Sequence, residues 1–277
     1  MMIEPHIHMI SRTTDDYNAM YDAGIRVCVE PSFWQGANRR YAGSFFDYFT
    51  LSLDFETTRA SRFGIDHWST IAMNPKESED EVLANEVIAG MDEYLRHERC
   101  ICVGEVGFNN YSSKEEKAFI KQVEIALDYN LPIMIHTPHV DKVAGTLRSI
   151  DILKDMGVPP EMGLVDHNTE ETIEASFNSG YYCGFTVYPI SKLNPERVSA
   201  IIKEYGSERM MVNGSADWGV SNPLALCDTA AQMKLDGHTE KAIQDLTLNN
   251  ALAFYSTSGK FKPHFDLKPL AVESFQR

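Results

Sequence analysis

The five residues Glu4-Pro5-His6-Ile7-His8, close to the start of the sequence, are the starting point for predicting its fold and site. We predict a short strand over residues 3–8, in which alternate side chains lie on one face, so that His6 and His8 project together. Neutral imidazoles are good ligands for zinc and similar ions. The pair would form half of a metal site, although two histidines near a chain end can also arise by chance. The remaining ligands must come from later in the chain.

The rest of the chain alternates predicted strands with predicted amphipathic helices. Helical periodicity is clear over residues 79–98 and 114–129, where apolar side chains recur on one side, and a further helix is expected over residues 44–62. The other expected strands cover residues 25–30, 68–72, 100–105, 131–136, 163–167, 182–185 and 210–213. Eight strands that alternate with helices predict an α/β fold, a closed (β/α)8 barrel of the TIM type in a single domain.

The main alternative to a barrel is an open, doubly wound sheet. No glycine-rich fingerprint follows the first predicted strand, which disfavours a dinucleotide-binding sheet of that kind. We therefore assign residues 1–259 to the barrel. The tail, residues 260–277, looks irregular, and we expect it to pack on the barrel exterior.

The composition is that of an ordinary globular protein, with 43% hydrophobic and 23% charged residues among 277. We expect no membrane helix, because no apolar run is long enough, and no signal peptide, because the first strand begins so early. Five cysteines without the spacing of a disulfide framework predict reduced thiols and a cytoplasmic location. The net charge of −15 would repel phosphates, so nucleic acid is not an expected partner.

Residues that favour metals occur at the ends of five predicted strands. In a (β/α)8 barrel the catalytic groups lie at the carboxyl ends of the strands. The residues found at or just beyond those ends are His6, His8, Glu105, His136, His167 and Asp217. Each has an ordinary alternative: a core histidine, a local hydrogen-bonded pair, an ion-pair partner or a turn cap. Together they predict a metal site. The histidines expected on the surface instead are His67, His97, His238 and His264.

The two carboxylates have distinct expected roles. A carboxylate can bridge two ions a few ångströms apart, which makes Glu105 the natural bridge in a two-metal site. Asp217 would bind one ion and accept the proton of the attacking water.

Three residues in loops at the expected barrel mouth are candidates for substrate binding. His139 lies in the loop after the fifth strand, where it could touch the substrate. Arg39 or Arg40, in the long loop over residues 32–41, could hold an anionic group. We expect this loop and residues 188–193 to shape the pocket.

The arrangement resembles the TatD-like metal-dependent hydrolases of the amidohydrolase superfamily over nearly the whole chain. The motifs that carry the resemblance are His6-x-His8, Gly104-Glu105-Val106-Gly107, the apolar run that ends at His136, His167, Asp217, and Asn249-Asn250-Ala251 followed by Phe254. The resemblance implies a (β/α)8 barrel with one or two divalent ions, in a family with many phosphodiesterases and deoxyribonucleases. It implies that one ion is bound by His6, His8, Glu105 and Asp217, and the other by Glu105, His136 and His167. Zinc is the expected metal, with manganese, nickel and magnesium as alternatives.

The sequence departs from the family pattern around these ligands. Glu4 stands where aspartate is usual, Pro138 where an arginine often contacts phosphate, and Asn168 where a cysteine often follows the histidine. We therefore predict a metal-dependent hydrolase that acts on a small-molecule ester, phosphoester, lactone or amide. The alternatives are a TatD-type deoxyribonuclease or phosphodiesterase, and a non-catalytic metal-binding barrel in a biosynthetic assembly. A homo-oligomer is compatible with each of them.

Overall fold

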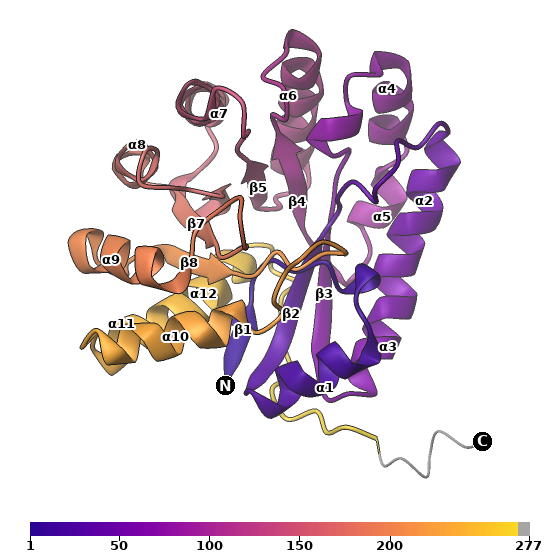
Figure 1. Cartoon of the computed structure of the whole chain (residues 1–277). Helices are drawn as coiled ribbons and strands as arrows, with labels where there is room; N and C mark the ends of the chain where they lie inside the picture. Colours follow the sequence, from indigo (N-terminus) through magenta and orange to yellow (C-terminus); the bar gives the residue numbers. More distant parts are fainter. Residues whose placement is uncertain (271–277) are drawn as a thin grey trace.

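Eight parallel strands pair in the order in which they occur along the chain, and helices surround them (Figure 1). The computed structural model describes residues 1–270. The strands are β1 (Met2–Glu4), β2 (Ile25–Pro31), β3 (Asp66–Ile71), β4 (Cys100–Gly107), β5 (Ile133–His136), β6 (Gly163–Asp166), β7 (Tyr182–Thr186) and β8 (Met210–Asn213). Parallel neighbours need crossover connections, and the helices that supply them form the outer layer. This confirms the predicted (β/α)8 barrel.

The helical segments of the outer layer follow the predicted alternation. They are α1 (Thr14–Asp22), α2 (Ala42–Thr50), α3 (Thr57–Ser61), α4 (Glu81–Ala89), α5 (Asp92–Leu95), α6 (Ser113–Asp128), α7 (Lys142–Asp155), α8 (Ile173–Ser179), α9 (Pro195–Tyr205), α10 (Ala225–Leu235), α11 (Glu240–Gln244) and α12 (Asn250–Ser256). Local sequence fixes several of their starts. Ser112 and Glu115 form a capping box at α6, and Asn194 caps α9 just before Pro195.

Three of the predicted elements differ substantially from the structure. The single helix expected over residues 44–62 consists of α2, a π-helical segment (Leu51–Glu56) and α3. The helix expected over residues 79–98 is divided at Gly90, between α4 and α5. The first strand ends at Glu4, so residues 5–8 extend beyond its paired part.

The first and last strands are joined just beyond their ends. The Ser215 N–H donates a hydrogen bond to the His6 carbonyl at 2.9 Å, and the His8 N–H donates to the Ala216 carbonyl at 3.0 Å. These two bonds hold residues 5–8 against the loop that follows β8. They position both histidines more directly than strand alternation does.

The barrel interior is a packed core of strand side chains. One buried cluster contains Ile3, Val27, Val29, Trp68, Ile101, Cys102, Met134, Leu164 and Met211, together with Phe254 and Tyr255 of α12. Phe261 joins this cluster, since its ring lies 5.1 Å from that of Trp68. Phe261, near the start of the tail, is thus buried, whereas residues 271–277 lie outside the described residues. The packing of the whole tail on the exterior stays a prediction.

His67 is a buried residue, and the prediction that it lies on the surface is wrong. It belongs to β3 and is fully buried, with Nε2 2.8 Å from Glu30 Oε2 on the neighbouring strand. Glu30 is a buried carboxylate and therefore requires a hydrogen-bonding partner. The imidazole of His67 on the adjacent strand is such a partner. The pair belongs to the framework of the barrel rather than to the candidate site.

Within residues 1–270, no helix combines the length and the apolar character needed to cross a membrane. The cytoplasmic location and the homo-oligomer stay predictions.

Candidate metal centre

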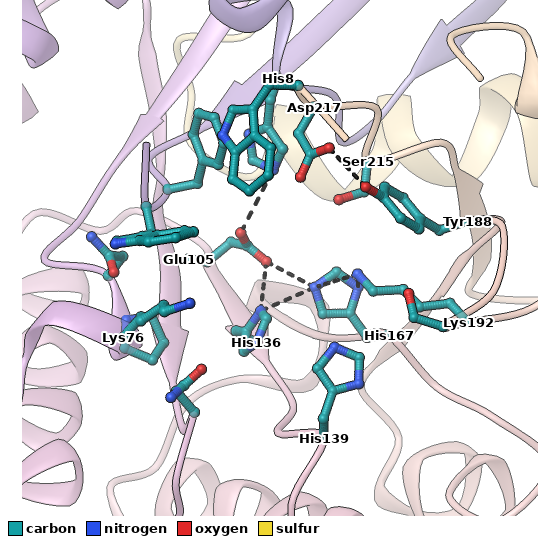
Figure 2. Close-up of a pocket in the computed structure, with 17 residues that line it drawn as sticks. His8, Lys76, Glu105, His136, His139, His167, Tyr188, Lys192, Ser215 and Asp217 are labelled. Atoms are coloured by element: carbon teal, nitrogen blue, oxygen red, sulfur yellow. Dashed lines mark hydrogen bonds and ion pairs between the residues drawn. The ribbon is translucent and has the colours of Figure 1, made fainter. Parts of the chain in front are cut away.

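A carboxylate near the end of β4 lies at the centre of the candidate site. Glu105 is buried, and each of its oxygens faces a different pair of histidines. Figure 2 shows its interactions with His8, His136 and His167. Its Oε1 lies 3.1 Å from His136 Nδ1 and 2.9 Å from His167 Nε2. Its Oε2 lies 3.6 Å from His6 Nε2 and 4.0 Å from His8 Nε2. The parallel topology brings these five residues together, because all of them lie at or near carboxyl ends of strands.

The ring nitrogens within each histidine pair approach each other as ligands of a shared ion would. His6 Nε2 lies 3.1 Å from His8 Nε2, and His136 Nδ1 lies 3.1 Å from His167 Nε2. Two nitrogens bound to one tetrahedral zinc ion would lie about 3.3 Å apart, since Zn–N bonds are ~2.0–2.1 Å long. Ligand atoms of His6, Glu105 and His167 also lie within 4.8 Å of one another. The nitrogen spacing within each pair fits one divalent ion there, and the cluster of His6, Glu105 and His167 has Glu105 between the two pairs.

The protonation states of these residues suit metal binding. Burial lowers the pKa of His8 well below its usual value, and the neighbouring His6 adds to this effect. Burial likewise lowers the pKa of His167, with a further contribution from the charge of Lys192. Burial would raise the pKa of Glu105, but the surrounding histidines hold it well below its usual value. Near pH 7 the two imidazoles are neutral and the carboxyl is ionised, the forms that bind metals.

Asp166, the last residue of β6, orients His6. Its Oδ2 lies 2.6 Å from His6 Nδ1, and it accepts hydrogen bonds from Asn213 Nδ2 at 3.1 Å and from the His167 N–H at 2.7 Å. A carboxylate that accepts a hydrogen bond from Nδ1 of a histidine leaves Nε2 available for a metal. Asp166 was not predicted as a site residue, because it directly precedes His167 and could be its local hydrogen-bonding partner. Its bond to His6 joins residues 160 positions apart, so no local pattern could have revealed it.

Asp217 lies in the same pocket, after β8, and one of its carboxylate oxygens is held in place. Oδ1 accepts hydrogen bonds from the Tyr188 hydroxyl at 2.8 Å and from the Gly219 N–H at 2.7 Å (Figure 2). Among the described residues no hydrogen bond reaches Oδ2, which is therefore available to an ion or a water molecule. Burial and the hydrogen bond to Asp217 raise the pKa of Tyr188 to about 12, so its hydroxyl remains a donor at neutral pH.

Replacing Tyr188 with phenylalanine is expected to lower kcat/KM about 10-fold. A hydrogen bond to a charged group contributes about 1.5–3 kcal/mol, and the Gly219 N–H still holds Oδ1 in the variant, so the lower end applies. The measurement is kcat/KM of the metal-loaded protein beside its thermal unfolding midpoint, with Tyr205→Phe, outside the pocket, as the control. Unchanged kcat/KM in Tyr188→Phe would show that this hydrogen bond does not position Asp217 for catalysis.

The structure places one of the three predicted substrate-binding residues in the pocket. His139 lines the pocket wall. Arg39 instead forms an ion pair with Glu77, and its guanidinium lies 3.7 Å from the centre of the Phe45 ring. Arg40 is exposed and is not part of the pocket lining. The two arginines were predicted to bind substrate from their charge and loop position, and the partner of Arg39 lies 38 residues further along the chain.

Lys76 and Lys192, which were not predicted as site residues, also line this pocket, whose volume is about 270 Å³. The Nζ of Lys192 lies 3.0 Å from His167 Nδ1. Lys76 is on the other side of Glu105, with its Nζ 3.6 Å from the centre of the Trp34 ring (Figure 2). The predicted role of residues 188–193 in shaping the pocket was the available signal for Lys192. Lys76 carried no comparable signal, because its segment was not expected at the site.

Comparisons with known proteins relate the chain to metal-dependent hydrolases and exonucleases. A family model described as TatD related DNase matches residues 5–255. An uncharacterised metal-dependent hydrolase of Methanocaldococcus jannaschii is 28% identical, over 92% of this chain and 99% of its own length. A 3'-5' ssDNA/RNA exonuclease TatD of Escherichia coli is 26% identical, over 54% of this chain and 58% of its own length.

Solved structures share the fold. A TatD-like protein of Archaeoglobus fulgidus superposes with a TM-score of 0.74 at 21% identity, covering 91% of this chain and 99% of that one. The phosphotriesterase homology protein of Escherichia coli, solved with phosphate in its active site, gives a TM-score of 0.65 at 17% identity, covering 92% and 98%.

Proposed function

The chain belongs to the TatD-related DNase family and is a metal-dependent hydrolase, and from this premise we propose that its substrate is a phosphoester. The observation that carries the proposal is the position of Lys192. In a chain with a net charge of −15, this ammonium lies within the candidate metal centre, against the ring of His167. A positive group at that place favours a substrate whose reacting group is an anion.

The surroundings of Lys192 support this role. Burial lowers the pKa of Lys192, while attraction to Glu105, Asp166 and Asp217 acts in the opposite direction. The ammonium faces His167 from the pocket, and phosphoryl oxygens are strong acceptors for such a group. An uncharged ester or a lactone would gain less from it. The position of Lys192 therefore favours a phosphoester among the four substrate classes considered.

Each residue of the centre would have a distinct role in hydrolysis. Divalent ions, when bound, would lower the pKa of a water molecule and polarise the phosphoryl oxygen. Glu105 would hold both ions, with one histidine pair at each. Asp217 would accept the proton of the attacking water through its free Oδ2, and Lys192 would donate a hydrogen bond to a phosphoryl oxygen. We expect zinc, with manganese, nickel and magnesium as the alternatives to be tested.

The expectation that nucleic acid is not a partner is not borne out. A matched relative is named as a single-stranded DNA and RNA exonuclease. The net charge describes the whole surface, whereas Lys76 and Lys192 bring positive charge to the pocket itself. We propose a small phosphoester as the first substrate to test, because the pocket volume of about 270 Å³ suits a small ligand. The end of a nucleic-acid strand is the second, and a non-catalytic barrel is not favoured.

The test is a substrate panel measured on protein loaded with zinc or with manganese. It contains a phosphomonoester, a phosphodiester, a carboxylic ester, a lactone and a single-stranded oligonucleotide. We expect the highest kcat/KM with a phosphoester, and loss of that activity on chelation of the metal. A higher kcat/KM with the lactone or the carboxylic ester would overturn the phosphoester proposal and leave the metal-dependent hydrolase in place.

Replacing Lys192 with methionine is expected to lower kcat/KM for a phosphoester about 10- to 100-fold. The change removes one charge-assisted hydrogen bond, which contributes about 1.5–3 kcal/mol, and keeps an unbranched side chain that is one atom shorter. Residual hydrolysis of an uncharged lactone should change less than threefold in the same variant. The control is Lys117→Met, an exposed lysine that pairs with Glu81. Equal losses with both substrates would mean that Lys192 supports the fold of the site rather than the anion.

A further inference from the structure

One wall of the pocket is aromatic, and the chemistry proposed above does not use it. Trp34 and Trp218, two of the three tryptophans in the chain, both line the pocket. Their rings meet edge to face, with centroids 5.7 Å apart and an interplanar angle of 67°. Trp218 keeps 53% of its surface exposed despite this contact. A large apolar ring left open to a pocket is a surface on which a ligand can stack.

The wall is held in place before any ligand arrives. The Trp34 Nε1–H donates a hydrogen bond to Asn38 Oδ1 at 2.9 Å, and the Lys76 ammonium lies 3.6 Å from the centre of the Trp34 ring. A cation at this distance from an indole is attracted by the electrons of the ring. The position of Trp34 is therefore fixed from two sides, and it in turn supports the edge of Trp218.

The sequence places this wall beside the metal centre. Trp218 directly follows Asp217, and Trp34 directly follows Phe33, whose ring stacks on His8 at 3.8 Å between centroids. The wall thus lies on the side of the site that holds His8 and Asp217. Lys192 lies on the opposite side, against His167 (Figure 2). A substrate whose phosphoryl group lies at Glu105 would extend its remaining part toward the tryptophans.

We propose that Trp34 and Trp218, with Lys76, form a subsite for a flat aromatic or heteroaromatic ring in the group attached to the scissile phosphoester. This inference rests on the phosphoester function proposed above and adds the class of substrate. Both an aryl group and a nucleobase have the required flat face, because stacking on an aromatic side chain does not depend on the identity of the ring. Lys76, at the edge of the subsite, would favour rings that carry electronegative substituents.

The test compares the binding of two non-hydrolysable probes, phenylphosphonate and methylphosphonate, to metal-loaded protein by isothermal titration calorimetry, with tryptophan fluorescence as the readout of contact with the wall. Trp68 is buried against Phe261 in the barrel core and serves as a constant background. We expect phenylphosphonate to bind about 10-fold more tightly, within the range for stacking on aromatic side chains, and to change the emission. A thymidine phosphonate added to the series distinguishes a nucleobase from a simple aryl group by which of the two binds more tightly.

Two variants separate stacking from a structural effect. Trp218→Ala and Trp218→Leu should both remove the preference for phenylphosphonate and leave methylphosphonate binding within twofold of wild type. The control is Phe55→Ala, which removes an exposed ring outside the pocket, at 55% exposure. Equal binding of the two phosphonates by wild type would overturn the subsite. So would a Trp218→Leu variant that keeps the full preference, or one that loses both probes equally.

If the substrate is not a phosphoester, the binding measurements give a different result. Neither phosphonate would then bind, and the comparison moves to a lactone that carries a phenyl group and its methyl counterpart. Tighter binding of the phenyl lactone, lost in Trp218→Leu, would retain the aromatic subsite without the phosphoester. No preference in either pair of ligands would reject the subsite.

Discussion

Replacing Glu105 with glutamine is expected to abolish measurable turnover while the protein remains folded. One carboxylate faces both histidine pairs, at 2.9 Å and 3.1 Å through Oε1 and at 3.6 Å and 4.0 Å through Oε2. An amide keeps the shape of the side chain but offers only one oxygen and no charge. Changes in groups that merely orient metal ligands already cost about 10- to 100-fold in affinity or activity. Loss of the bridging ligand should therefore cost well over 100-fold.

The measurement for Glu105→Gln is kcat/KM together with metal affinity by calorimetric titration and a thermal unfolding curve. Glu116→Gln, which alters a carboxylate paired with Arg148 away from the pocket, is the matched control and should retain activity. Activity within tenfold of wild type would contradict the bridging role. Unfolding of the metal-free variant, with metal-free wild type folded, would assign Glu105 to the barrel framework instead.

Replacing Asp217 with asparagine is expected to lower kcat by about 10²- to 10⁴-fold, the usual contribution of a general base. Asparagine retains an oxygen for the hydrogen bonds from Tyr188 and Gly219, so the loop after β8 should keep its position. What the variant loses is the charge and the proton-accepting capacity of Oδ2. The effect should therefore appear in kcat, with thermal stability close to that of wild type.

The matched control for Asp217→Asn is Asp92→Asn, an exposed carboxylate that pairs with Arg96. A fall in KM and kcat by the same factor, or full activity, would contradict a role for Asp217 as proton acceptor. Metal content separates its two expected roles, because Asp217 is also proposed as a ligand of the ion at His6 and His8. Reduced kcat with full metal content identifies the proton acceptor alone.

The barrel could be predicted because its signals are local. Alternation of strand and helix patterns, capping residues and loop lengths are properties of short segments, and they suffice for eight parallel strands in chain order. The positions of Glu105 and His136 followed from the same logic, since each lies within a strand near its carboxyl end.

The parts that could not be predicted depend on contacts between distant segments. His6 and His8 were expected to share a strand face, but β1 ends at Glu4. The pair is positioned by backbone hydrogen bonds to residues 215 and 216, and by the Glu4 carboxylate, which accepts hydrogen bonds from the His6 and Gly214 N–H groups. Glu4, a departure from the family pattern, thus ties the start of the barrel to its end.

Charged residues in loops were the least predictable part of the site. Arg39 forms an ion pair with Glu77, whereas Lys192, which also lies in a loop, lines the pocket. The sequence near either residue does not indicate whether an acidic side chain from a distant segment will pair with it. His67 shows the same limit in the core, because its partner Glu30 lies on the neighbouring strand.

The central claim is that Glu105 joins two histidine pairs into a centre for two divalent ions. The most direct test is the metal content per chain, by elemental analysis, of protein purified without a histidine tag and dialysed against zinc or manganese. We predict about two ions in wild type, since each of the two pairs offers a site, and about one in His6→Ala/His8→Ala, which keeps His136 and His167. No bound metal in wild type, or the same content in the variant, would contradict the account.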